Sequence, residues 1–273
     1  MKKLFPIFFL SAILFSCGGD DDDDNGGTLF EQLTGLTPAN DVELGMQVDA
    51  EIRNNPDQFP ILDETEFSES YTYLNAMMTD ILESNDIEYR NLFAWELSII
   101  GDDETLNAFA TPGGYIYVYT GLIKFLDNAD DLAGVMGHEI AHADLRHSSD
   151  QMKQQFGLSL ISSILLGGQS DQVSQIVNGL AGLSFSRSDE SEADEYSVIY
   201  LGDTDYACNG AAAFFQKLID SGSAGGTPEF LSTHPNPDNR VEDINAKAAS
   251  DGCSTDLIAE TGMTYAEFIA SLP

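Results

Sequence analysis

The chain has 273 residues, of which 42% are hydrophobic, so it holds enough apolar material for one sizeable core or at most two small ones, and disorder throughout is excluded. Its 11 Lys and Arg residues against 46 Asp and Glu residues give a formal net charge of -35. A surface this acidic repels phosphate backbones, so we expect no nucleic-acid partner.

The first residues are typical of an export signal. Two lysines precede an apolar run from Leu4 to Phe15, which is too short to cross a bilayer as a mature helix. The run ends at Leu-Phe-Ser-Cys17, which resembles the lipobox of bacterial lipoproteins and implies that Cys17 becomes the lipid-bearing first residue. The alternative is an ordinary secretory signal with a chance cysteine. In either case we expect the protein to leave the cytoplasm, and residues 1–16 are interpreted as a lipoprotein signal peptide.

An acidic stretch follows, with two glycines, five aspartates from Asp20 to Asp24, and then Asn-Gly-Gly. Such a segment cannot bury a core, so we expect residues 17–28 to be a flexible tether, which would hold the folded part on the order of 20 Å or more from the lipid. The acidic run also resembles the surface-export signals of Bacteroidota lipoproteins. The anchored protein would therefore lie on the periplasmic face of the outer membrane or on the cell surface.

Residues 29–273 show no internal repeat and no second linker, which predicts one domain. Apolar periodicity predicts strands over 92–100 and 114–119, and helices over 40–54, 71–84, 130–148, 151–166, 171–183, 189–201, 210–221, 237–250 and 264–272. The expected fold is therefore of the α+β class, mostly helical with a small β-sheet. The apolar stretch 157–166 is too short to span a membrane and would form either a core hairpin or a hairpin that dips into lipid.

Two cysteines remain once Cys17 carries lipid. Cys208 and Cys253 could pair as a disulfide in an oxidising envelope, although the sequence does not give their separation in space. No Cys-x-x-Cys spacing occurs, so a thiolate metal site is not indicated.

The chemistry is concentrated in His138-Glu139-Ile140-Ala141-His142. Histidines at i and i+4 of a helix differ in direction by about 40°, so both imidazoles can reach one zinc ion. Glu139 points about 100° away from His138, beside the metal, where it can accept a proton from water. The alternative is two core histidines and a surface glutamate. His147 lies off the ligand face and is interpreted as a structural or helix-end residue.

A catalytic zinc site needs three protein ligands and an open position. With no spare cysteine, an acid is the expected third ligand, and the candidate segment is 186–194. Glu190 and Asp194 share a helix face, which suits one ligand and one acceptor for a ligand imidazole N–H. Glu192 faces elsewhere and is expected to be solvated.

Three further motifs accompany this helix: Asn-Ala-Phe-Ala-Thr-Pro-Gly-Gly-Tyr-Ile-Tyr-Val at 107–118, the acidic segment 186–194, and Thr-His-Pro at 233–235 followed by Arg240. Together they resemble the zinc peptidase family that includes HtpX, BepA and the CAAX prenyl endopeptidase, over about 41–246 in the same order. The chain lacks the hydrophobic transmembrane helices of HtpX, so the resemblance is to the soluble, envelope-resident members.

This resemblance implies roles for individual residues. Glu190 would be the third ligand of one Zn2+ per chain, after His138 and His142, and Asp194 would support the site. Glu139 would take a proton from the attacking water and deliver it to the leaving amine.

The resemblance also places His234 and Arg240 near the developing oxyanion. Two alternatives remain open. In the first, the His-Pro sequence is a simple turn and Arg240 forms a salt bridge. In the second, His234 fills the fourth zinc position and holds the enzyme latent.

The strand after Pro112 has a predicted use in substrate binding. Peptide substrates of zinc peptidases bind extended, so Gly113, Gly114, Tyr115, Ile116 and Tyr117 would offer an open edge to the substrate backbone. The alternative is an ordinary core strand, because alternating tyrosines also suit a half-buried sheet.

These patterns predict a zincin-type metalloendopeptidase, anchored in the bacterial envelope through lipid on Cys17. Its substrates would be unfolded or loop segments of envelope proteins, and the resemblance implies a role in protein quality control. The rival class is a non-catalytic or latent zinc-containing chaperone or assembly factor. The oligomeric state is not predicted.

Overall fold

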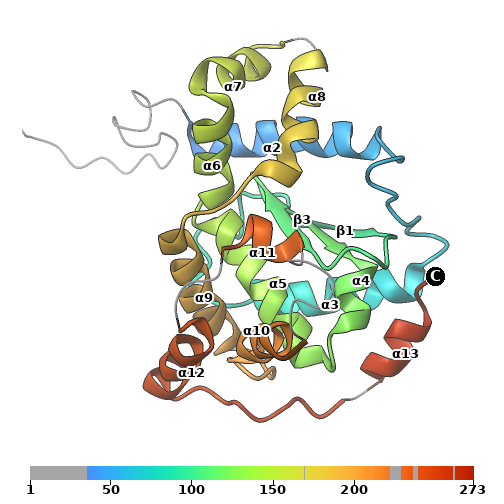
Figure 1. Ribbon diagram of the computed structural model, residues 1–273, viewed down its shortest axis with the longest axis vertical. Coiled ribbons are helices and arrows are strands. Elements are labelled where there is room, and N and C mark those ends of the chain that lie inside the picture. Colours follow the sequence, from blue (N-terminus) through green and yellow to red (C-terminus); the bar gives the residue numbers. More distant parts are fainter. Residues whose placement is uncertain (1–35, 169, 222–228, 236–238, 261) are drawn as a thin grey trace, which may run out of the picture.

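A computed structural model of the chain describes residues 36–168, 170–221, 229–235, 239–260 and 262–273 (Figure 1). The expected signal peptide 1–16, the expected tether 17–28 and Cys17 lie outside the described residues. The fold is mostly helical with a small sheet, which confirms the predicted α+β class.

The elements follow one another as α2 (Pro38–Arg53), α3 (Ser68–Leu82), β1 (Glu96–Ile100), β2 (Ala108–Thr111), β3 (Tyr115–Tyr119), α4 (Thr120–Phe125), α5 (Ala129–Asp144), α6 (His147–Phe156), α7 (Leu158–Leu165), α8 (Ser170–Gly179), a 3-10 turn (Leu180–Gly182), α9 (Arg187–Leu201), α10 (Gly210–Ser221), α11 (Glu229–Thr233), α12 (Arg240–Asp251) and α13 (Tyr265–Ala270). None of the helices within the described ranges is long and apolar enough to cross a membrane.

The three strands form one sheet in the order β1-β3-β2, with β1 parallel and β2 antiparallel to β3. Because β3 is paired on both sides, its backbone cannot accept a further strand, and the prediction that Gly113, Gly114, Tyr115, Ile116 and Tyr117 offer an open edge is wrong. Among the described strands, the edge beside the zinc helix is β2. All five residues of β3 are buried, as the core-strand alternative requires.

The turn between β2 and β3 explains the paired glycines. Gly113 and Gly114 have φ angles of 78° and 86°, in the left-handed region that residues with a Cβ rarely adopt. A Cβ on Gly113 would also lie 2.8 Å from the backbone oxygen of Asp41. These glycines therefore serve the tight turn rather than a substrate.

The sheet separates two apolar cores, because side chains alternate between its faces. On β3, Ile116 and Val118 face the larger core with α3, α5, α9 and α10, whereas Tyr115, Tyr117 and Tyr119 face a smaller core under α2 and α6 to α8. Figure 1 shows the same layers, with α2, α7 and α8 on one side of the sheet and α3, α5 and α10 on the other. The alternating tyrosines thus fill the second core.

Helix α5 carries the zinc motif and is buried along its whole length. It begins where the side chain of Asn128 accepts a hydrogen bond from the backbone N–H of Asp131. On one side α10 packs so closely that a Cβ on Gly134 would lie 2.0 Å from the backbone nitrogen of Ala211. On the other side α5 packs against α9. This packing fixes the directions of the motif's side chains.

The predicted helix over 130–148 ends early, at Asp144. Arg146 adopts a left-handed conformation with φ of 63°. Its guanidinium lies 2.6 Å from the Asp41 carboxylate and donates a hydrogen bond of 2.6 Å to the backbone oxygen of Leu36. The predicted helix over 151–166 is likewise divided, at Gly157, where φ is 82°. His147 therefore begins a new helix, α6, and can turn back toward α5.

Two further predictions concern the disulfide and the apolar stretch 157–166. Cys208 and Cys253 are joined in a disulfide, with their Cα atoms 6.2 Å apart. Helix α7 buries Ile161 and Ile164 in the smaller core, which is the core-hairpin alternative, while Leu166 beyond its end is 89% exposed.

Candidate metal centre

Helices α5 and α9 bring both motif histidines against the acidic segment. Nε2 of His142 lies 3.0 Å from Nε2 of His138 and 3.3 Å from a carboxylate oxygen of Glu190. The second oxygen of Glu190 lies 3.5 Å from Nε2 of His138. All three side chains are buried, with at most 1% of their surface exposed. The three ligands expected from the sequence thus face one point.

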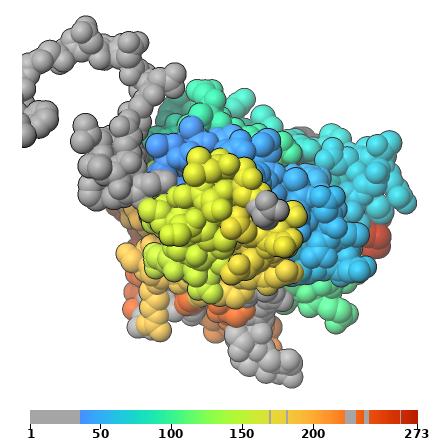
Figure 2. All heavy atoms as spheres, turned by 90° about the horizontal axis from the view of Figure 1, so that it is seen from above, coloured from blue at the N-terminus to red at the C-terminus, as the bar shows by residue number. Residues whose placement is uncertain are grey.

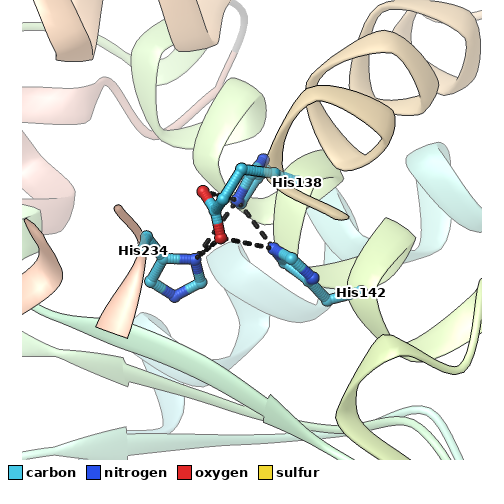
Figure 3. A group of neighbouring side chains, drawn as sticks. His138, His142 and His234 are labelled. Atoms are coloured by element: carbon cyan, nitrogen blue, oxygen red, sulfur yellow. Dashed lines mark hydrogen bonds and ion pairs between the residues drawn. The ribbon is translucent and has the colours of Figure 1, made fainter. Parts of the chain in front are cut away.

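His234 joins this cluster from the end of α11. Its Nδ1 lies 3.0 Å from the carboxylate of Glu190 and 3.4 Å from Nε2 of His138. Figure 3 shows His138, His142 and His234 pointing toward one another. One ligand atom from each of these four residues lies within 4.8 Å of the others. The ring of His234 stacks on Phe230, with centroids 4.3 Å apart, which holds it in this direction.

The donor set fits zinc. Three imidazole nitrogens and one carboxylate oxygen match the ligand types and the tetrahedral number that zinc prefers. The donors are fully buried and close-packed, so without a cation the carboxylate would depend on neighbouring histidines and arginine for its charge balance. His138, His142 and Glu190 would hold the ion, and His234 lies where a fourth ligand would.

Asp194 and Arg240 support the ligands. An oxygen of Asp194 lies 3.0 Å from Nδ1 of His138, so it can accept that ring's N–H and leave Nε2 free for the metal. The guanidinium of Arg240 lies 2.6 Å from Asp194 and 3.0 Å from Glu190, and it stacks over Phe215 at 3.5 Å. Arg240 is thus engaged by two carboxylates of α9, in keeping with the salt-bridge alternative.

Glu139 lies buried beside the cluster, and its carboxylate makes no hydrogen bond to the described residues. Nε2 of His234 lies 3.6 Å from one of its oxygens. Burial raises the pKa of this carboxyl, although its electrostatic interactions with His234 and His138 act in the opposite direction. A buried carboxylate with raised proton affinity is suited to act as a general base.

Charge balance within the cluster differs from residue to residue. Burial alone would lower the pKa of His138, but its hydrogen bonds to Asp194 and Glu190 outweigh burial and raise that pKa to about 9. Burial and the neighbouring charge of His138 hold the pKa of His142 well below its usual value. Burial would raise the pKa of Glu190, but the surrounding histidines keep it well below the usual range. Glu190 is therefore an anionic ligand at neutral pH.

His147 and Glu192 also reach the centre, which the sequence did not indicate. Nδ1 of His147 lies 3.1 Å from Nδ1 of His142, and its Nε2 lies 3.3 Å from the Glu192 carboxylate. Glu192 is exposed, as expected, but its carboxylate also contacts His147. The two contacts depend on the helix break at Arg146 and on the position of α9. A third histidine close behind the motif was the only available signal.

A cavity of about 180 Å³ opens beside His234. Its wall is largely apolar and includes the edge strand β2 and the segment before α9, with Phe109, Ala110, Leu183 and Phe185. The side chain of Ser148, on α6, donates a hydrogen bond of 2.8 Å to the backbone oxygen of Ala110 on β2. The cavity thus lies between the edge strand β2 and His234.

Comparison with known proteins identifies the family of this chain. Peptidase family M48 matches residues 68–248, about two thirds of the chain. The chain belongs to peptidase family M48. Members of this family use zinc, in agreement with the donor set. The matched region contains the motif on α5, the acidic segment on α9, and both His234 and Arg240.

Individual relatives were also found. The beta-barrel assembly-enhancing protease of Escherichia coli (strain K12) is 33% identical over 164 residues, which is 55% of this chain and 34% of that protein. The mitochondrial metalloendopeptidase OMA1 of Bos taurus is 29% identical over 199 residues, 66% of this chain and 38% of that protein. Metalloprotease YcaL of Escherichia coli is 30% identical over 152 residues, 53% and 59% respectively. This chain thus spans about a third of the length of the beta-barrel assembly-enhancing protease.

Proposed function

We propose that this chain is a zinc-dependent metalloendopeptidase of the bacterial envelope that hydrolyses peptide bonds in unfolded or loop segments of envelope proteins. The observation that carries the proposal is the buried carboxylate of Glu139, which has no hydrogen-bond partner among the described residues, beside the cluster of His138, His142 and Glu190. Family membership and relatives named as metalloendopeptidases support the same activity.

His138, His142 and Glu190 would hold one zinc ion per chain. When bound, zinc supplies Lewis acidity that polarises the scissile carbonyl and activates water. Glu139 accepts a proton from the attacking water at its carboxylate and returns that proton to the leaving amine. Asp194 keeps the ring of His138 in the tautomer whose Nε2 is free, and Arg240 holds Asp194 and Glu190 in place.

His234 gives the resting enzyme a latent form in this proposal. Its Nδ1 faces the cluster together with the other donors, in the position that water would take in a catalytic site. Substrate hydrolysis then requires that the imidazole of His234 move away. Once displaced, the ring is available to donate a hydrogen bond to the oxyanion.

The substrate binds along β2 rather than β3. Strand β2 is the edge of the sheet, and an extended peptide would pair with its backbone by β-augmentation. The peptide would compete with the hydroxyl of Ser148 for the backbone oxygen of Ala110. A bulky apolar side chain of the peptide would fill the cavity beside Phe109 and Phe185.

Metal analysis and cleavage of unfolded casein test the enzymatic proposal. The purified protein should contain one zinc per chain and cut casein, and Glu139→Gln should abolish cutting while keeping the zinc. Mass spectrometry of the products should show cleavage before or after bulky apolar residues. Equal cutting rates of wild type and Glu139→Gln would contradict the role of Glu139 as the general base.

A second candidate function is that of a latent zinc-containing chaperone or assembly factor. The position of His234 in the cluster favours it, because a zinc ion with four protein ligands has no open site for water. If His234→Ala, which removes the fourth donor, and the double variant with Glu139→Gln are both inert toward casein but equally suppress aggregation of an unfolded envelope protein, the chaperone function holds.

Residues 1–16 are proposed as the signal peptide, 17–28 as the tether and 29–273 as the peptidase domain. Lipid on Cys17 would anchor the protein to the outer membrane, on its periplasmic face or at the cell surface. Mass spectrometry of the N-terminal peptide tests the anchor. A diacylglyceryl-modified Cys17 is expected, and Cys17→Ser should release the protein into the soluble fraction.

A further inference from the structure

The imidazole of His142 makes contacts on both of its nitrogens. Its Nε2 faces His138 and Glu190, at 3.0 Å and 3.3 Å. Its Nδ1 faces Nδ1 of His147 at 3.1 Å, and the far nitrogen of His147 lies 3.3 Å from the carboxylate of Glu192. The other motif histidine, His138, has its Nδ1 against Asp194 instead. The two metal-facing rings are therefore supported by different kinds of partner.

The tautomers of this chain of contacts depend on one another. A histidine that binds a metal through Nε2 carries its proton on Nδ1, so His142 must donate to His147. Nδ1 of His147 must then accept, which places the proton of His147 on Nε2. That N–H points at Glu192, a carboxylate that can only accept. Every contact is satisfied in this one arrangement.

The opposite arrangement is unfavourable at both ends of this chain of contacts, at the metal cluster and at Glu192. If His142 carried its proton on Nε2, an N–H would point into the cluster, and His147 would have to donate through Nδ1. The bare Nε2 of His147 would then face the carboxylate of Glu192, so two acceptors would meet. Glu192 therefore disfavours the tautomer that cannot bind metal.

We infer that His147 and Glu192 are positioning residues that set the metal-binding tautomer of His142. His147 is 93% buried, whereas the carboxylate of Glu192 is half exposed, so a surface group acts on a fully buried ligand through one imidazole. Phe185 stacks on the His142 ring at 3.8 Å and prevents it from turning to find another acceptor. Helix α9 thus supplies Glu190 to the cluster. It also supplies Glu192 to the chain of contacts from Glu192 through His147 to His142, which is called the relay below.

Zinc affinity, measured by competition with a chelator, tests the first step. His147→Leu removes the acceptor for Nδ1–H of His142, and we expect a loss of about 10- to 100-fold in affinity, the range found for such supporting partners. His147→Asn places an amide oxygen near the position of Nδ1 and should keep the affinity within a few-fold of wild type. Thermal unfolding of the metal-free variants shows whether each is folded.

The second step is tested on the protein surface, where folding is not at risk. Glu192→Ala should weaken zinc binding several-fold, whereas Glu195→Ala, which removes an equal charge from the same helix but contacts Lys247, should leave it unchanged. In the His147→Asn background Glu192→Ala should have no further effect, because the link to Glu192 is already lost. Equal losses from Glu192→Ala in both backgrounds would contradict the relay.

Nitrogen-15 spectra of the imidazoles report the tautomers directly. In the zinc-loaded protein, His147 should carry its proton on Nε2 and His142 on Nδ1. A proton on Nδ1 of His147 would overturn the inference. The inference rests on the proposed zinc site, and the two fail differently: wild type without zinc contradicts both, whereas wild type with zinc and an unaltered affinity in His147→Leu contradicts the relay alone.

Discussion

Arg240→Met tests whether Arg240 neutralises the acidic side of the centre. The side chain is 2% exposed and spans Asp194 and Glu190, which are themselves buried. Methionine keeps the stem against Phe215 but leaves two buried carboxylates without their counterion. Breaking a buried pair in this way typically costs about 3–5 kcal/mol in the free energy of unfolding.

For a folded part of this size, each kcal/mol corresponds to about 2–4 °C in melting temperature. The metal-free Arg240→Met variant should therefore melt about 6–20 °C below wild type. Excess zinc should restore part of this difference, because an ion bound to Glu190 supplies positive charge in place of the one lost with Arg240.

Calorimetry of both proteins, with and without zinc, makes the comparison, and Lys153→Met provides the matched control. Lys153 also pairs with one carboxylate, that of Asp150, but at the surface. Removing such an exposed pair should cost at most about 1 kcal/mol. If Arg240→Met is no more destabilising than Lys153→Met, the reasoning about the buried charges is refuted.

Three further predictions concern separate features. His234→Ala should raise casein turnover by about tenfold or more, because it frees the position that the imidazole fills in the latent form; initial rates at saturating zinc measure the change, and a lower rate would contradict the latent form. Burial raises the pKa of Asp131 to about 6 in the folded state. The unfolded chain releases this proton near the ordinary pKa of 3.8, whereas the native chain still holds it. Stability is therefore lost as the pH rises from about 4 through 6. Asp131→Asn should therefore gain about 2 kcal/mol relative to wild type between pH 4 and pH 8 in urea unfolding, and an equal difference at both pH values would contradict the buried-acid assignment. Replacing Cys208 and Cys253 together by alanine opens a loop of 45 residues and should cost about 4 kcal/mol in the chain-entropy estimate, whereas an unchanged urea midpoint would show that the bond does not stabilise the fold.

Local periodicity was sufficient to predict the helix that carries the zinc motif. The spacing of His138 and His142 is a property of one helix, and so is the shared face of Glu190 and Asp194. These i and i+4 relations within one helix do not depend on how the other helices are arranged. The assignment of Glu190 rather than Asp194 to the ligand position came from the family resemblance, since spacing left it open.

The parts that failed depend on contacts between distant segments. The helix break at Arg146 is fixed by Asp41 and Leu36, about 100 residues earlier in the chain, so no local pattern marks it. The contact between His147 and Glu192 follows from that break. Strand β2 has only four residues and no alternating pattern, so the sequence does not predict it. Without β2, the sequence predicts that β3 is an open edge of the sheet. Strand order is a property of the whole sheet.

X-ray absorption at the zinc edge of the loaded protein tests the metal centre most directly, with His138→Ala, Glu190→Gln and His234→Ala measured beside wild type. The account predicts a four-coordinate ion with nitrogen and oxygen neighbours at about 2.0–2.2 Å, three of them imidazole nitrogens while His234 is present and two after His234→Ala. A sulfur neighbour, or a first shell unchanged by His138→Ala and Glu190→Gln, would contradict it.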